Sequence, residues 1–75
     1  MASDEQTTGT GDVTYDLVSV LYHALQGAEL YEEYASDAEQ GGDQELSQFF
    51  REVQQEERRR AERAQQFLAK RLQNG

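Results

Sequence analysis

The chain has 75 residues, a net charge of −8 and no cysteine, proline or tryptophan. This length fits at most one domain, and the lack of cysteine excludes a disulfide framework, a thiolate zinc site and an iron–sulfur cluster. The acidic balance disfavours nonspecific nucleic-acid binding, because phosphates would be repelled. No signal-peptide pattern is present, and no apolar run approaches the roughly 20 residues that span a bilayer. We therefore expect a cytoplasmic protein without membrane or nucleic-acid partners.

The charge is distributed unevenly along the chain. Residues 1–50 hold eleven acids and no lysine or arginine, whereas residues 51–75 hold seven bases and four acids. Acids are interleaved among the late bases, which favours a solvated helix face over a nucleic-acid patch. In an antiparallel hairpin this distribution predicts a negative tip at the turn and a more positive opposite end, and that polarity favours antiparallel association of two hairpins.

Residues 1–12 are small and polar, contain two glycines and lack an apolar period, so they predict a disordered N-terminal tail. From residue 13 the pattern changes to apolar residues at alternating spacings of three and four, which predicts a helix over about 13–40. Asp12 or Thr14 can cap its start, and Gly41-Gly42 ends it. The predicted core stripe comprises Leu17, Leu21, Ala24, Ala28, Tyr31, Ala35 and Ala38.

A second helix is predicted over about 44–73, after a turn at 41–43 in which Asp43 is a good N-cap. Lys70 and Arg71 suit the negative C-terminal end of the helix dipole. The predicted apolar positions are Leu46, Phe49, Phe50, Val53, Ala61, Ala64, Phe67, Leu68 and Leu72. The short connection predicts an all-α, antiparallel two-helix hairpin over residues 13–75.

Each apolar stripe is too wide for one neighbouring helix to cover. We therefore expect two hairpins to pair as a homodimer, or as a larger symmetric oligomer, in a four-helix bundle. Small residues on the first helix should allow close approach of the helices, and Phe49, Phe50 and Phe67 should fill the opposing gaps in the bundle. The small residues are Ala24, Ala28, Ala35 and Ala38.

Two acidic residues fall on or near these apolar stripes. Glu57 lies in the middle of the second stripe, and Glu32 lies on the flank of the first, with Glu29 further round. A carboxylate in a bundle core must be paired, hydrogen-bonded or bound to metal. Arg60 follows Glu57 by three residues and predicts a structural core ion pair, whereas Arg51 is a candidate partner for Glu32.

The alternative is an all-carboxylate site between subunits for iron or another hard cation, formed by Glu57 of two chains with Glu29 or Glu32. Carboxylate-bridged metal sites in four-helix bundles use a Glu-x-x-His motif. Arg60 stands where that motif would need histidine after Glu57, and the only histidine, His23, has no glutamate three residues before it. The sequence therefore predicts no catalytic residues and no cofactor. In the alternative hypothesis the ligand is iron.

A pattern of Tyr31, Ala35-Ser36-x-Ala38, Gly42, Phe50 and Glu56-Glu57 covers much of residues 23–64. This segment resembles the first helical pair of rubrerythrin and the short encapsulated ferritins, both of the ferritin-like superfamily. The resemblance implies a two-helix chain that completes a four-helix bundle by dimerising, and weakly a location inside a protein compartment. Glu57 matches the glutamate of the family's Glu-x-x-His, and Arg60 replaces its histidine.

Together these patterns predict a noncatalytic ferritin-like helical oligomer that acts as a structural, assembly or binding module. An iron-binding or iron-oxidising protein is the alternative. An adaptor whose acidic half docks a basic protein partner is a third hypothesis.

Overall fold

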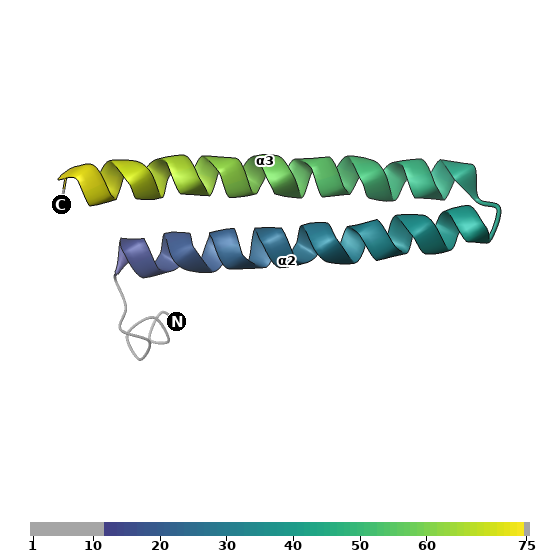
Figure 1. Cartoon of the computed structure of the whole chain (residues 1–75), viewed down its shortest axis with the longest axis horizontal. Coiled ribbons are helices and arrows are strands. Elements are labelled where there is room, and N and C mark those ends of the chain that lie inside the picture. The colour runs from purple at the N-terminus through teal and green to yellow at the C-terminus, as the bar shows by residue number, and fades with distance from the viewer. Residues whose placement is uncertain (1–11, 75) are drawn as a thin grey trace, which may run out of the picture.

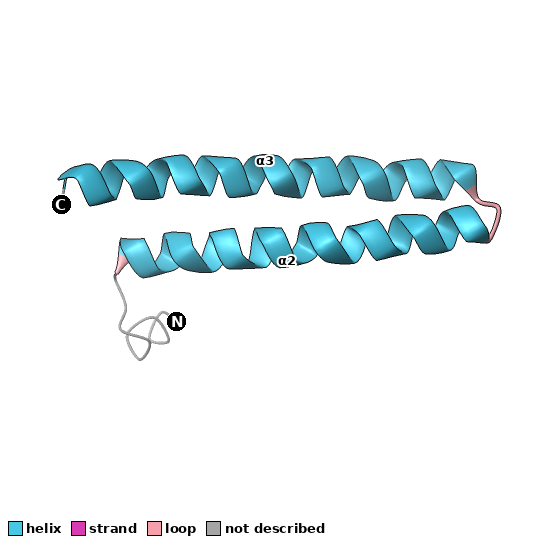
Figure 2. Ribbon diagram, viewed as in Figure 1, coloured by secondary structure: helices cyan, strands magenta, loops and turns pink. Residues whose placement is uncertain are grey.

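The computed structural model describes residues 12–74, which form two helices joined by a tight turn. Helix α2 comprises Val13–Gln40 and helix α3 comprises Gln44–Asn74, and the two run antiparallel side by side (Figures 1 and 2). The all-α hairpin predicted from the spacing of apolar residues is thus confirmed. The predicted tail lies outside the described residues, apart from Asp12.

Local side chains define where each helix begins. The Asp12 carboxylate accepts hydrogen bonds from the backbone N–H groups of Thr14 at 3.0 Å and Tyr15 at 3.4 Å, which satisfies donors that the first turn of α2 leaves free. Asp43 does the same for α3, because its Oδ1 accepts from the Leu46 N–H at 3.0 Å. Both caps agree with the sequence-based prediction.

Two glycines reverse the chain between the helices. Gly41 keeps a right-handed helical conformation, and Gly42 follows with a φ of 85°. Residues with a Cβ rarely adopt this left-handed conformation. The Asp43 N–H then donates to the Ala38 carbonyl at 2.9 Å, which closes the turn. This geometry brings α3 back along α2.

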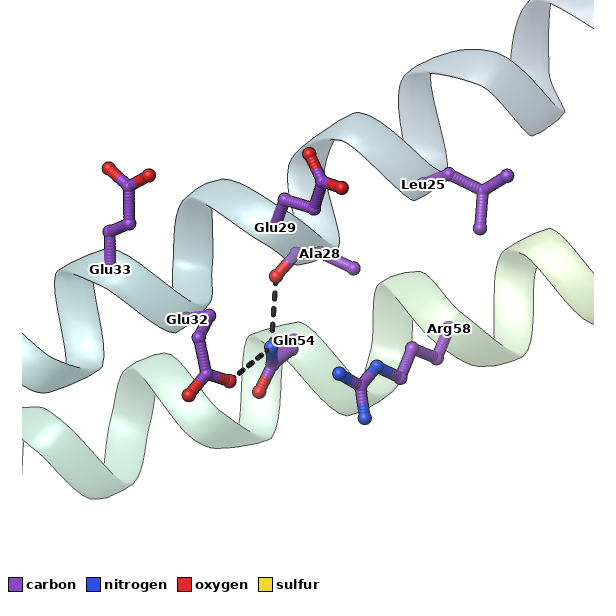
Figure 3. Close-up of a pocket in the computed structure, with 7 residues that line it drawn as sticks. All are labelled: Leu25, Ala28, Glu29, Glu32, Glu33, Gln54 and Arg58. Carbon is purple, nitrogen blue, oxygen red and sulfur yellow. Dashed lines mark hydrogen bonds between the residues drawn. The ribbon is translucent and has the colours of Figure 1, made fainter.

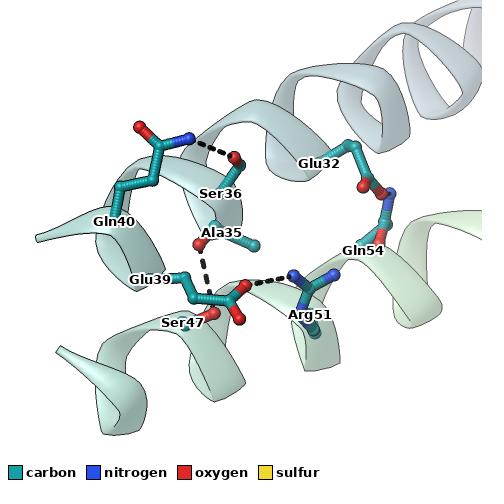
Figure 4. A network of polar contacts seen from close by, with 8 residues as sticks. All are labelled: Glu32, Ala35, Ser36, Glu39, Gln40, Ser47, Arg51 and Gln54. Carbon is teal, nitrogen blue, oxygen red and sulfur yellow. Dashed lines mark hydrogen bonds and ion pairs between the residues drawn. The ribbon is translucent and has the colours of Figure 1, made fainter. Parts of the chain in front are cut away.

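Small residues form the seam between α2 and α3, so the helices pack closely. The buried residues are Ala24, Ala28, Ala35, Ala38, Ala61, Ala64, Ser47 and Gln54. The two polar members also bond across the seam. The Ser47 hydroxyl donates to the Ala35 carbonyl at 3.1 Å (Figure 4), and Gln54 Nε2 donates to the Ala28 carbonyl at 2.9 Å (Figure 3).

The seam of α3 is rotated from the apolar stripe that the sequence indicated. Ser47 and Gln54 lie seven residues apart, Ala61 follows seven residues later, and all three are buried. Phe49 and Phe67 remain 53% and 49% exposed, so they do not pack between α2 and α3 of one hairpin. Large apolar side chains are therefore left on the surface of the hairpin. Over residues 12–74, neither helix has the length and apolar character needed to cross a membrane.

Candidate functional site

Two rows of residues at seven-residue spacing run beside the seam, one on each helix. We call them together the apolar face. Each row follows one side of its helix, because seven residues make nearly two turns. The rows are Val13, Val20, Gly27 and Tyr34 on α2, and Leu46, Val53, Arg60 and Phe67 on α3. Six of the eight positions hold large apolar side chains, and Val53 is the only one of these six that is half-buried rather than exposed.

The two rows lie on the same side of the hairpin. In each row the residue directly precedes a seam residue, as Tyr34 precedes Ala35 and Leu46 precedes Ser47. When two right-handed helices run antiparallel, the residues that come just before the seam residues in sequence lie on the same side of the hairpin in both helices. Tyr34 and Leu46 accordingly line one shallow groove with Phe50.

Aromatic contacts extend this groove along the face. The ring of Tyr34 lies 5.6 Å from that of Phe50 and 5.6 Å from that of Tyr31, between ring centroids. Phe49 lies 5.6 Å from Phe50 in the same way. Tilted and edge-on arrangements such as these are favourable for aromatic rings. The cluster forms the part of the apolar face nearest the turn.

A charged pair interrupts the face near its middle. Arg60 Nη1 donates to Glu57 Oε1 at 2.7 Å, and the two side chains are 53% and 21% exposed. Glu57 lies over Gly27, where a Cβ would meet its Cδ at 3.6 Å. Glu57 therefore uses the space above a residue without a side chain. The i,i+3 pair expected from the sequence is present, but it lies at the surface of the single hairpin.

Glu29 and Glu32 lie on the other side of the hairpin. They line an open groove between α2 and α3 with Leu25 and Arg58 (Figure 3). Glu32 turns toward α3, where its Oε1 accepts a hydrogen bond from Gln54 Nε2 at 2.9 Å. The carboxylate of Glu29 extends away from α3 in the same view.

The expected pairing of Glu32 with Arg51 is wrong. Arg51 Nη2 instead donates to Glu39 Oε1 at 3.2 Å, and both side chains are largely exposed (Figure 4). The bonds of Ser47 to Ala35 and of Gln54 to Ala28 place Arg51 and Glu32 at nearly the same level. Side chains lean toward the N-terminus of their own helix, so Arg51 leans toward the turn and reaches Glu39, whereas Glu32 leans away from the turn and bonds Gln54. An exposed pair such as this contributes little to stability.

Within one chain the three predicted metal ligands do not converge. Glu29 and Glu32 line the groove beside Arg58, whereas Glu57 lies against Gly27 and pairs with Arg60. Between residues 12 and 74, no group of three or more histidines and acids is arranged to hold a metal ion. The iron site between subunits needs a second chain and stays a prediction.

His23 takes part in local contacts on α2. Its Nδ1 lies 2.9 Å from the Ser19 carbonyl, and its ring meets that of Tyr22 edge-on at 5.4 Å. Such a bond back to the preceding turn orients the imidazole on the helix surface.

Three residues of these surfaces were missed by the sequence-based prediction. Ser47 and Gln54 are polar, so they do not belong to a stripe of apolar residues. The signal that could have identified them is the spacing of seven residues from Ser47 to Gln54 and from Gln54 to Ala61. The role of Gly27 as the space beneath Glu57 appears only when both helices are in place. Comparison of the chain with known protein families, curated proteins and solved structures finds no significant match.

Proposed function

We propose that the chain is a noncatalytic structural module that works by binding a second copy of itself through the apolar face. The observation that carries this proposal is the position of the large side chains. The hairpin buries alanines between its helices and leaves residues such as Tyr34, Leu46 and Phe67 more than 40% exposed on one side. A contiguous exposed apolar surface of this kind is characteristic of an interaction site.

The size of the face suits a second hairpin. Helix α3 is about 45 Å long, and two adjacent helices are about 20 Å wide, which gives a face of about 900 Å² per chain. Stable protein interfaces bury about 800 Å² per partner. Two hairpins stacked through this face would form a four-helix bundle, in agreement with the ferritin-like resemblance of residues 23–64. Polar residues border the rows, as Asp16, Asp37 and Arg63 do, in the manner of an interface rim.

Native mass spectrometry at micromolar concentration tests this proposal. We expect the parent chain to be a dimer or a larger symmetric oligomer, and Phe67→Glu to weaken association at least about 100-fold, because the new carboxylate would lose its water in an apolar interface. Helix formation should survive, since Arg63 and Arg71 lie one turn on either side. Gln65→Glu is the matched control, because it adds the same charge on the opposite flank of α3. A parent chain that stays monomeric, or equal effects of the two variants, would refute the proposal.

The same measurement with ferrous iron tests the alternative function. The noncatalytic proposal expects the same mass for the dimer with and without iron, because the Glu57 carboxylate is engaged by Arg60. Iron bound to the parent dimer, and lost in Glu57→Gln, would replace this proposal with the carboxylate metal site.

A further inference from the structure

The interruption of the apolar face lies at the centre of the hairpin. Gly27 and Arg60 are each the third of four residues in their rows, and they stand close to the midpoints of the 28-residue α2 and the 31-residue α3. Glu57 fills the position between them, over Gly27. Apolar residues flank this polar centre toward both ends of the hairpin, with Val20 and Phe67 on one side and Tyr34 and Val53 on the other.

The charged pair is incompletely satisfied in one chain. An arginine side chain has five N–H donors and a carboxylate has several acceptor positions. The bond of 2.7 Å between Arg60 and Glu57 uses one of each, and half of the Arg60 side chain is still exposed to water. Covering the face would remove that water, so the remaining donors and acceptors would need new partners.

The two ends of the hairpin differ in charge. The turn half, residues 28–56, carries nine acids and Arg51 alone as a base, which is a net charge of −8. The open half, residues 12–27 and 57–74, carries four acids and six bases, which is a net charge of +2. Stacking two hairpins in parallel would set turn half against turn half, whereas antiparallel stacking sets each turn half against an open half.

Antiparallel stacking also brings the charged pairs together. With a two-fold axis across the middle of the face, α3 of one chain lies over α3 of the other in the opposite direction. Glu57 and Arg60 are about 4.5 Å apart along the helix. An axis between their levels therefore places Arg60 of each chain opposite Glu57 of the other. In the parallel arrangement α3 would lie over α2, and Arg60 would face the region of Val20 and Ala24, which offers it no carboxylate.

We propose, resting on self-association through the apolar face, that the dimer is antiparallel and that Arg60 of each chain bonds Glu57 of both. The resulting network of four charged side chains at the two-fold axis fixes the register. Sliding one hairpin by seven residues would place Arg60 against Phe50 or Ala64 of the second copy, where its charge has no partner. Gly27 provides room for the network because it has no side chain.

Charge reversal tests the network. Arg60→Glu gives a chain with two acids at the axis, and Glu57→Arg gives a chain with two bases. We expect each variant to self-associate at least about tenfold more weakly than the parent, and an equimolar mixture to form heterodimers with near-parental affinity in native mass spectrometry. A mixture that associates no better than its components would overturn the network.

Distances between spin labels test the orientation. The chain lacks cysteine, so Gln40→Cys labels the turn end alone and Gln73→Cys labels the open end alone. Antiparallel stacking predicts about 40 Å between the two labels of either homodimer, and a short distance when the two variants are mixed. A turn-to-turn distance below about 20 Å would overturn this inference while leaving the proposed self-association intact. A parent chain without dimers would instead refute the proposed function.

Discussion

Gln54 is the residue that ties the two helices together most closely. It is buried, and its amide bonds both the Ala28 carbonyl and the Glu32 carboxylate, each at 2.9 Å. Hydrogen bonds to charged groups contribute more to stability than neutral ones. The polar side chain of Gln54 therefore stabilises the contact between α2 and α3, a role that a larger apolar residue usually has.

Replacing this amide tests its role. Gln54→Ala should lower the free energy of unfolding by about 1–2 kcal/mol, because both bonds and their packing are lost. Gln55→Ala is the matched control, since Gln55 is exposed, and it should change stability by less than about 0.5 kcal/mol. Urea unfolding at a fixed protein concentration measures both. Equal effects would show that the bonds across the seam contribute nothing.

At this scale the sequence predicted some contacts and missed others. The pairing of Arg60 with Glu57 follows from their spacing on one helix. The partners of Glu32 and Arg51 depend on how side chains lean along two antiparallel helices, which sequence spacing does not supply. Ser47 and Gln54 were missed because both are polar, and a stripe defined by apolar residues does not include them.

At the scale of the elements, the turn is the most strongly determined part of the hairpin. Gly41 has a φ of −80°, and Gly42 has a φ of 85°. Only the second value requires glycine. Caps at Asp12 and Asp43 and the glycine turn are local signals, which explains why the bounds of both helices could be predicted from the sequence within a residue or so.

The two glycines of the turn provide a matched pair of variants. Gly42→Ala should cost about 1 kcal/mol, because alanine in the left-handed conformation is strained. Gly41→Ala should be nearly neutral, since its Cβ would meet the Asp37 carbonyl at an ordinary 3.4 Å. Thermal unfolding followed by circular dichroism compares the two. A larger loss from Gly41→Ala would contradict this account of the turn.

At the scale of the whole molecule, the hairpin and its proposed assembly should share their stability. Chains that fold only as dimers unfold at a temperature that depends on concentration. A tenfold increase in protein should add about 1.4 kcal/mol and raise the Tm by about 3–6 °C for a dimer of this size. Phe67→Glu should remove this dependence. A parental Tm that is constant over a 100-fold range of concentration would contradict the proposal.

The arrangement of helices in the hairpin could be predicted from the sequence, because it follows from periodicity and a short connection. The identity of the exposed face could not be predicted. The seam of alanines determines it, and the seam depends on how closely two backbones approach. The burial of Ala28, Ala35 and Ala61 is what sets the seven-residue rows beside the seam.

The alanine seam has a consequence for how the chain acquires its structure. Burying a methyl group contributes about 0.8 kcal/mol, and burying a leucine- or phenylalanine-sized side chain contributes about 1.5–3 kcal/mol. In the proposed dimer, most of the hydrophobic free energy would therefore become available only when two chains meet. We expect refolding to be a second-order reaction whose half-time shortens as protein concentration rises. Newly made chains would then persist once synthesis is fast enough for them to encounter one another before proteases act.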